Sequence, residues 1–168
     1  MKRIATHKRP DPDAIVAAWL AERYLFANDD EVDIVFVGRK RPGFDPPLAD
    51  CVVDVGNVYD PARLLFDHKP PAFADRNETC ATRLIWLHLL GLGRPVWHLS
   101  TLVNAIHEGD RNPPGKPGPL LLESRRNGFH AQFARLRSEC GGEEARLYAA
   151  SRKWLDGHAA TLSLSKRR

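Results

Sequence analysis

The sequence has no apolar run long enough to cross a membrane, and its first residues lack the apolar core of a secretory signal. From these two absences we expect a soluble, cytoplasmic protein without a membrane partner. Cysteine is also scarce. Cys51, Cys80 and Cys140 are an odd number with no C-x-x-C spacing. This pattern argues against a disulfide framework and favours reduced, mostly buried thiols.

Neither low hydrophobicity nor an extreme charge is present, which argues against a largely disordered chain. The 168 residues are 43% hydrophobic and 27% charged, with a formal net charge of +4 and a pI of about 9.1. A mildly basic chain suits an anionic partner such as a nucleotide or a short nucleic acid, although many basic enzymes bind neither. The length allows one domain with a full core and a small helical appendage.

Apolar stretches of two lengths alternate along the chain. Residues 14–26 are apolar almost all round and predict a buried helix, whereas the β-branched run 32–37 predicts a buried parallel strand. We therefore predict an α/β fold, in which a doubly wound, mostly parallel sheet is flanked by helices. The other expected strands cover 3–6, 51–55 and 64–66, and the other helices cover 79–90, 99–108, 120–126, 129–140 and 143–157.

A run rich in proline and glycine, residues 112–119, is the clearest candidate linker. It separates a first α/β unit over 1–111 from a helical C-terminal extension over 120–168. The extension is too short for a second α/β domain. We expect it to pack on the first unit or to exchange contacts with a partner subunit, which makes a homodimer plausible.

Four short motifs place histidines and carboxylates at predicted strand ends or in loops. In a doubly wound sheet, ligands bind beyond the carboxyl ends of the strands, so we expect these side chains to share one site. The motifs are His7-Lys8-Arg9-Pro10-Asp11-Pro12-Asp13-Ala14, Val53-Asp54-Val55-Gly56, Phe66-Asp67-His68-Lys69 and Glu108-Gly109-Asp110.

These residue types suit a pair of divalent cations. Hard cations prefer carboxylate oxygens, and Mn²⁺ also accepts imidazole. Two ions about 3.5–4 Å apart can activate water and stabilise an in-line phosphoryl displacement. Asp11 and Asp13 lie two residues apart in a turn before a helix, so each can face a different ion. Pro10 and Pro12 stiffen that turn.

The first motif matches the pattern H-x-x-P-D-x-D-A without a gap. With the other motifs it resembles the DHH phosphoesterase superfamily, which includes RecJ-type exonucleases and short-oligonucleotide phosphatases. The run from Asp54 to Pro61, followed by Phe66-Asp67-His68, is similar to Myg-type exonucleases. The resemblance covers residues 1 to about 110.

The resemblance implies a role for each motif residue. Two Mn²⁺ ions would be bound, with Mg²⁺ or Co²⁺ as possible replacements, and the water between them would be the nucleophile. His7, Asp11 and Asp54 would hold the first ion. The second would be held by Asp13, Asp54, His68 and Asp110, with Asp54 as the bridge. Asp67 would orient His68, and Asp54, His68 and Lys69 would form the catalytic group.

Lys69 departs from the family pattern, in which a second histidine contacts the substrate phosphate. A lysine can still bind phosphate, as a point charge on a flexible stem. The full accessory domain of longer relatives is also missing, so substrate binding would fall to Lys69, Arg111 and Lys116, with Arg125 and Arg126 nearby. We expect a Mn²⁺-dependent phosphoesterase of an exonuclease-like kind, acting on a nucleotide or short oligonucleotide. The alternative is a non-catalytic module that binds a nucleotide or a partner.

Each motif residue also has a simpler interpretation. Asp11 and Asp13 could be turn and cap residues, and Asp110 could merely end a helix. Thr79 and Thr82 begin a predicted helix whose amides could receive a phosphate, although plain capping would explain them as well. His130 and His158 are expected at the surface.

Overall fold

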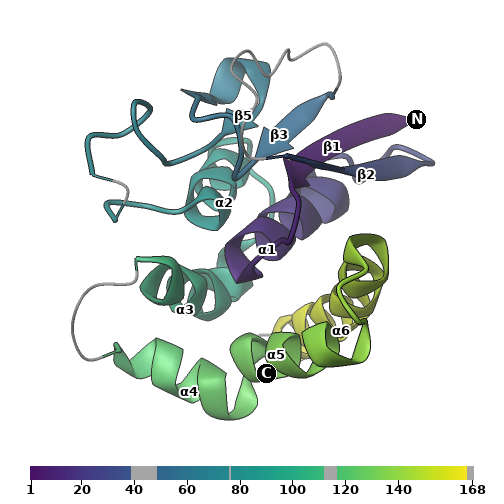
Figure 1. Ribbon diagram of the computed structural model, residues 1–168, viewed down its shortest axis with the longest axis vertical. Coiled ribbons are helices and arrows are strands. Elements are labelled where there is room, and N and C mark those ends of the chain that lie inside the picture. Colours follow the sequence, from purple (N-terminus) through teal and green to yellow (C-terminus); the bar gives the residue numbers. More distant parts are fainter. Residues whose placement is uncertain (39–48, 76, 112–116, 166–168) are drawn as a thin grey trace.

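The computed structural model describes residues 1–38, 49–75, 77–111 and 117–165. It contains a mixed, mostly parallel sheet of five strands in the order β2-β1-β3-β5-β4. The sheet lies along one side of the molecule, with the labelled helices below it in Figure 1. Strands β2, β1, β3 and β5 run parallel, and β4 is antiparallel to β5. The α/β prediction with a mostly parallel sheet is therefore confirmed. The strands are β1 (Lys2–His7), β2 (Val32–Val37), β3 (Cys51–Val53), β4 (Tyr59–Asp60) and β5 (Leu65–Phe66).

The sequence prediction differs from the structure mainly at three strands. Strand β2 has the expected bounds, but it is half-buried because it lies at the sheet edge and pairs only with β1 among the described residues. Strand β4 was not predicted, since two residues are too few to show an alternating pattern. Strand β3 ends at Val53, and the next residue, Asp54, has a φ of 56° that takes the chain out of the strand.

Helix α1 (Pro12–Leu20) lies between the sheet and the C-terminal helices (Figure 1). Its residues 14–20 are all buried, which explains why the sequence is apolar on every side of this helix. Asp11 is the N-cap, and its Oδ1 accepts a hydrogen bond from the Ala14 amide at 3.0 Å. A π-helical turn, η1 (Ala21–Leu25), continues the helix toward β2.

The second half of the chain is helical and shares the core of the sheet. Phe129 and Leu155 belong to the same buried cluster as Ile4 and Trp19. The division of the chain at 112–119 remains a prediction, and residues 112–116 lie outside the described ranges. The remaining elements are η3 (Pro61–Arg63), α2 (Ala81–Gly91), η4 (Trp97–Leu99), α3 (Ser100–Asp110), α4 (Pro119–Asn127), α5 (Phe129–Glu139) and α6 (Glu144–Ser165).

Two predictions about composition can be compared with this fold. Cys51, Cys80 and Cys140 are free and buried, as expected for reduced thiols. Across the described ranges, the helices are all too short or too polar to span a membrane.

The strand order has a topological switch point between β1 and β3. From β1 the chain passes to β2 on one side, and it later returns to form β3 on the other side. Connections leave in opposite directions at such a switch point, so the carboxyl ends of the two strands border an open space. His7 is the last residue of β1, and Asp54 directly follows β3. The fold therefore places both residues at the usual ligand position of an open α/β sheet.

Candidate metal centre

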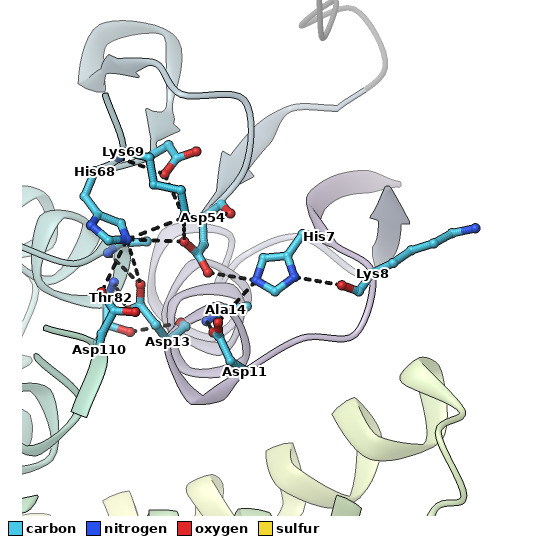
Figure 2. A network of polar contacts seen from close by, with 12 residues as sticks. His7, Lys8, Asp11, Asp13, Ala14, Asp54, His68, Lys69, Thr82 and Asp110 are labelled. Atoms are coloured by element: carbon cyan, nitrogen blue, oxygen red, sulfur yellow. Dashed lines mark hydrogen bonds and ion pairs between the residues drawn. The ribbon is translucent and has the colours of Figure 1, made fainter. Parts of the chain in front are cut away.

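The six side chains predicted as metal ligands converge beyond the carboxyl ends of the parallel strands (Figure 2). They come from five places in the fold. His7 ends β1, Asp54 follows β3 and His68 follows β5, while α1 begins beside Asp11 and Asp13 and α3 ends at Asp110. Their ligand atoms form two groups. The first consists of His7, Asp11 and Asp54, and the second of Asp13, His68 and Asp110. A third group, made of Asp54, Asp67 and His68, shares one residue with each of them.

His7 is fully buried and has a defined orientation. Its Nδ1 lies 2.8 Å from the carbonyl oxygen of Lys8. A carbonyl oxygen can only accept, so Nδ1 carries a proton and donates it. Nε2 therefore faces the carboxylates, 2.9 Å from Asp54 Oδ2 and 3.6 Å from Asp11 Oδ2. A backbone carbonyl that fixes the tautomer in this way is typical of histidines that bind a metal through the other nitrogen.

His68 is the centre of the second group. Its Nε2 lies 3.4 Å from Asp110 Oδ2, 3.5 Å from Asp54 Oδ1 and 3.9 Å from Asp13 Oδ2. Ligand atoms that surround one divalent ion at about 2.1 Å are separated by about 3.0–3.4 Å in octahedral or tetrahedral geometry. The shorter distances are close to this spacing. One imidazole nitrogen thus meets three carboxylates from separate parts of the chain, as Figure 2 shows.

Asp54 lies between the two groups. Its Oδ2 faces His7 and its Oδ1 faces His68, which is the arrangement that a bridging carboxylate requires. The residue is buried and its φ of 56° is in the left-handed region, where aspartate is tolerated better than most residues. A strained backbone that aims a side chain into a cluster is commonly found at functional sites.

Asp13 has a structural role in addition to its place in the cluster. Its carboxylate accepts hydrogen bonds from the Ala81 amide at 2.9 Å and the Thr82 amide at 2.8 Å, so it caps α2. The Thr82 hydroxyl donates to the Asp13 carbonyl at 3.1 Å. Asp13 therefore already occupies the Thr82 amide, one of the two amides expected to receive a phosphate, whereas the role of the Thr79 amide stays a prediction.

Asp67 and Lys69 connect the loops that carry the ligands. Asp67 Oδ2 accepts from the Asn57 amide at 2.8 Å, and Oδ1 accepts from the Lys69 amide at 3.2 Å and from Lys69 Nζ at 3.0 Å. Lys69 Nζ also donates to Asp54 Oδ1 and to the Asp54 carbonyl, the latter at 3.3 Å. From the sequence we expect Lys69 to bind a substrate phosphate. In the structure its ammonium group instead contacts Asp54 and Asp67.

Opposite charges at short range shift the pKa values of the cluster. Burial lowers the pKa of His7, but hydrogen bonds to Asp11 and Asp54 outweigh it and raise the pKa to about 10. Burial likewise opposes the effect of Asp54, Asp13 and Asp110 on His68, whose pKa is raised to about 9. The pKa of Asp54 falls well below its usual range, since His68, His7 and Lys69 outweigh its burial.

The two remaining carboxylates shift in the opposite direction. Burial, followed by repulsion from Asp54 and Asp110, raises the pKa of Asp13 to about 7. Burial also raises the pKa of Asp110, to about 6, although the positive charge of His68 opposes it. Burial is the larger cause for both residues, and a cation bound beside them would favour their ionised forms.

Asp110 provides a direct test of whether these residues fit a metal. Its Oδ2 is buried and makes no hydrogen bond within the part of the chain that the structure describes. An ion pair with His68 at 3.4 Å is its recorded contact. A buried carboxylate oxygen without a donor is costly unless a cation binds it. This atom and the fixed tautomer of His7 both fit a site for divalent ions.

A cavity of about 260 Å³ opens beside the cluster. Asp11, Asp13 and Asp110 line one side, and Arg125 and His130 of the C-terminal helices are also part of the lining. His130 was expected at the surface, but it is half-buried, and its Nδ1 lies 2.9 Å from Ser124 Oγ. Burial, followed by the charge of Arg125, lowers the pKa of His130 to about 4, so the ring is neutral at pH 7.

No pattern in the sequence indicates that His130 lies at this cavity. Its position depends on a close approach of α5 to α3, which glycine permits: a Cβ atom on Gly109 would lie 2.5 Å from His130 Nε2. The sequence also predicts three other residues near the substrate. Arg111 and Arg126 are exposed at the ends of α3 and α4, and Lys116 lies outside the described residues.

Comparisons of the chain with family models, with curated proteins and with solved structures find no match. The kind of protein is therefore inferred from its fold and its site alone. It is an α/β protein with a mostly parallel sheet and a buried histidine–aspartate cluster that could hold metal ions.

Proposed function

We propose that this protein is a divalent-metal-dependent phosphoesterase of the DHH type that hydrolyses a nucleotide or a short oligonucleotide, with Mn²⁺ as the ion. One observation carries the proposal. His7 Nε2 faces two carboxylates in the loops that follow β3 and β1, Asp54 Oδ2 at 2.9 Å and Asp11 Oδ2 at 3.6 Å, while its Nδ1 donates to the Lys8 carbonyl.

The position of the cluster supports the same conclusion. A site at the carboxyl ends of parallel strands, beside a topological switch point, is where open α/β proteins bind nucleotides and other anions. The motif order that resembles the DHH superfamily brings its residues together at this point. Imidazole combined with carboxylate suits Mn²⁺, because purely oxygen sites favour Mg²⁺ or Ca²⁺.

Different residues of the chain would have different roles. His7, Asp11, Asp13, Asp54, His68 and Asp110 are the available metal ligands. A bound divalent ion would supply an activated water and would stabilise the negative charge that develops on the phosphoryl group. Asp67 holds the loop of Lys69 to the loop of Asn57, and so positions the ligands on either side.

The cavity beside the cluster is the candidate substrate site. Arg125 can form paired hydrogen bonds to a phosphate oxygen, and the neutral ring of His130 can donate or accept one. A volume of about 260 Å³ suits a mononucleotide or the end of an oligonucleotide better than a long duplex. The net charge of +4 is compatible with an anionic substrate.

One observation favours the second candidate function, a non-catalytic module that binds a nucleotide or a partner. The Lys69 ammonium group contacts Asp54, the residue proposed to bridge the ions. A cation at this point could limit turnover while binding is retained. Hydrolysis assays therefore distinguish the two functions, since tight nucleotide binding without product over a long incubation would favour the second.

The proposal is tested with the variant Asp54→Asn. Removing the bridging charge should lower Mn²⁺ affinity by more than about 100-fold, because even residues that only orient a ligand contribute 10- to 100-fold. Calorimetry measures the affinity, and a Mn²⁺-dependent assay on a dinucleotide and on bis(p-nitrophenyl) phosphate measures hydrolysis. Asp30→Asn, an exposed aspartate outside the cluster, is the matched control. A wild-type protein that binds no Mn²⁺ would overturn the proposal.

A further inference from the structure

We infer that Lys69 takes the place of one metal ion, so that the cluster binds a single divalent cation through His7, Asp11 and Asp54. The inference rests on the proposed metal-dependent function and deepens it. It begins with the direction of the lysine side chain. Although Lys69 belongs to a surface loop, its side chain is only 23% exposed and points into the cluster (Figure 2).

The ammonium group of Lys69 has the surroundings of a bound cation. It donates to Asp54 Oδ1, to the Asp54 carbonyl at 3.3 Å and to Asp67 Oδ1 at 3.0 Å. Its Nζ is also 3.4 Å from His68 Nε2, one of the proposed ligand atoms. Three oxygen contacts use the three donors of an ammonium group. The lysine is therefore fully engaged inside the cluster.

These contacts fall on the half of the cluster that a second ion would use. A bridging carboxylate gives one oxygen to each ion. Asp54 Oδ1 faces His68, and this is the oxygen that Lys69 holds. A divalent ion placed among Asp13, His68 and Asp110 would have to share Oδ1 with the ammonium group. Two positive charges at such short range repel strongly in a buried site.

Asp67 keeps Lys69 in this position. Asp67 is fully buried and binds both the backbone amide and the ammonium group of Lys69, while its other oxygen accepts from the Asn57 amide. A side chain held at two points by a buried carboxylate is less free to leave than an ordinary surface lysine. An arriving ion would therefore find the Oδ1 side of Asp54 taken.

The Oδ2 side of Asp54 is where the single ion would bind. There His7 Nε2 is 2.9 Å from Oδ2, and Asp11 Oδ2 is 3.6 Å from the same nitrogen. Asp11 is 36% exposed, so this half of the cluster opens to solvent. The adjoining cavity is lined by Asp11 and also by Asp13 and Asp110. Asp13, by contrast, uses both oxygens to cap α2.

The number of ions bound by each variant tests this inference. Calorimetry and metal analysis after gel filtration should give one Mn²⁺ per wild-type chain, with the electron paramagnetic resonance pattern of an isolated ion. Lys69→Met should bind two ions and show the pattern of a spin-coupled pair. Lys69→Arg keeps the positive charge and should still bind one. Lys8→Met is the matched control, because that lysine is exposed and points away from the cluster.

Two further variants locate the ion. His7→Ala should remove the single ion of the wild type, whereas Asp110→Asn should leave it in place with less than a threefold change in affinity. In the Lys69→Met background, Asp110→Asn should remove only the second ion. Circular dichroism of each variant shows that it is folded before its ions are counted.

The count in the wild-type protein separates the outcomes even if Lys69→Met fails to fold. Two ions per wild-type chain, or a single ion that Asp110→Asn removes, would overturn the role of Lys69 and leave the metal-dependent function standing. No ion in the wild type would overturn both.

Discussion

Asp54 and its two histidine neighbours show how individual residues prepare the site for a cation. Each histidine faces carboxylates with Nε2, and in the metal-free protein both rings are protonated near neutral pH because their pKa values are raised to about 10 for His7 and about 9 for His68. A metal ion must displace such a proton, since the same nitrogen cannot hold both. Metal and proton thus compete for one position.

This competition predicts a pH dependence of Mn²⁺ binding. Between pH 6 and pH 8 the pH is below the pKa of His7, so an ion bound there releases about one proton, and its apparent affinity should rise about tenfold per pH unit. Calorimetry in buffers of different ionisation enthalpy measures the released proton. His7→Gln should lose most of the pH dependence. An affinity that stays constant across this range would contradict the assignment of His7 as a ligand.

The six candidate ligands could be predicted from the sequence because they occur in short motifs at strand ends or at the end of a helix. The partner of Lys69 could not. Motif spacing places this lysine near the site but does not specify whether its ammonium group points toward a substrate or toward Asp54. That choice depends on Asp67, which binds the lysine backbone and side chain together in the folded loop.

At the scale of elements, the side-chain carboxylate of Asp13 links α1 to α2. Asp13 lies in the first turn of α1 and caps α2 by accepting hydrogen bonds from the Ala81 and Thr82 amides. The start of both helices therefore lies beside the cluster. Asp11 is the cap of α1 itself, with one hydrogen bond and a more exposed side chain. The two aspartates of the first motif therefore contribute to stability in different amounts.

We predict that Asp13→Ala lowers the free energy of unfolding of the metal-free protein by about 2 kcal/mol, because two buried amides lose their acceptor. Relief of repulsion with Asp54 and Asp110 keeps the loss from being larger. Asp11→Ala should cost about 1 kcal/mol or less. Urea titrations in the presence of a chelator measure both. An Asp13→Ala protein as stable as the wild type would show that the capping bonds contribute little.

The sequence predicted the order of the elements better than their ends. The all-round apolar pattern of α1 was informative because a central helix has no solvent-facing side. The end of the last helix was predicted at Gly157, since glycine costs about 1 kcal/mol in a helix interior. Helix α6 nevertheless continues to Ser165, because Ala159 joins the core and Leu162 packs against it. Tertiary contacts here outweigh local propensity.

At the scale of the whole molecule, the C-terminal helices complete the cavity beside the metal centre. They share one hydrophobic core with the sheet and bring Arg125 and His130 toward the cluster. A local sequence pattern could not predict that these residues line one cavity. Asp11 and Arg125 are far apart in the sequence and come together only in the folded protein. These helices therefore border the candidate site as well as contributing to the core.

This arrangement predicts that Arg125→Ala weakens substrate binding without affecting the metal. Loss of a charged hydrogen bond to phosphate should raise KM about 10- to 100-fold, while Mn²⁺ affinity stays within twofold of the wild type. Steady-state kinetics on a dinucleotide and calorimetry measure the two effects. Arg126→Ala, which removes the next arginine of α4, is the control and should change neither. Equal kinetic effects of both variants would place the substrate elsewhere.

The bonds from Asp13 to the start of α2 need no metal ion. These bonds use only groups of the chain, and Lys69 supplies a positive charge to the cluster from within. The polypeptide can therefore reach its final shape first and acquire its ion afterwards. An ion bound at this cluster should therefore be exchangeable: we expect a chain stripped by a chelator to stay folded and to be refillable, so that the metal supply at the time of loading decides which ion it carries.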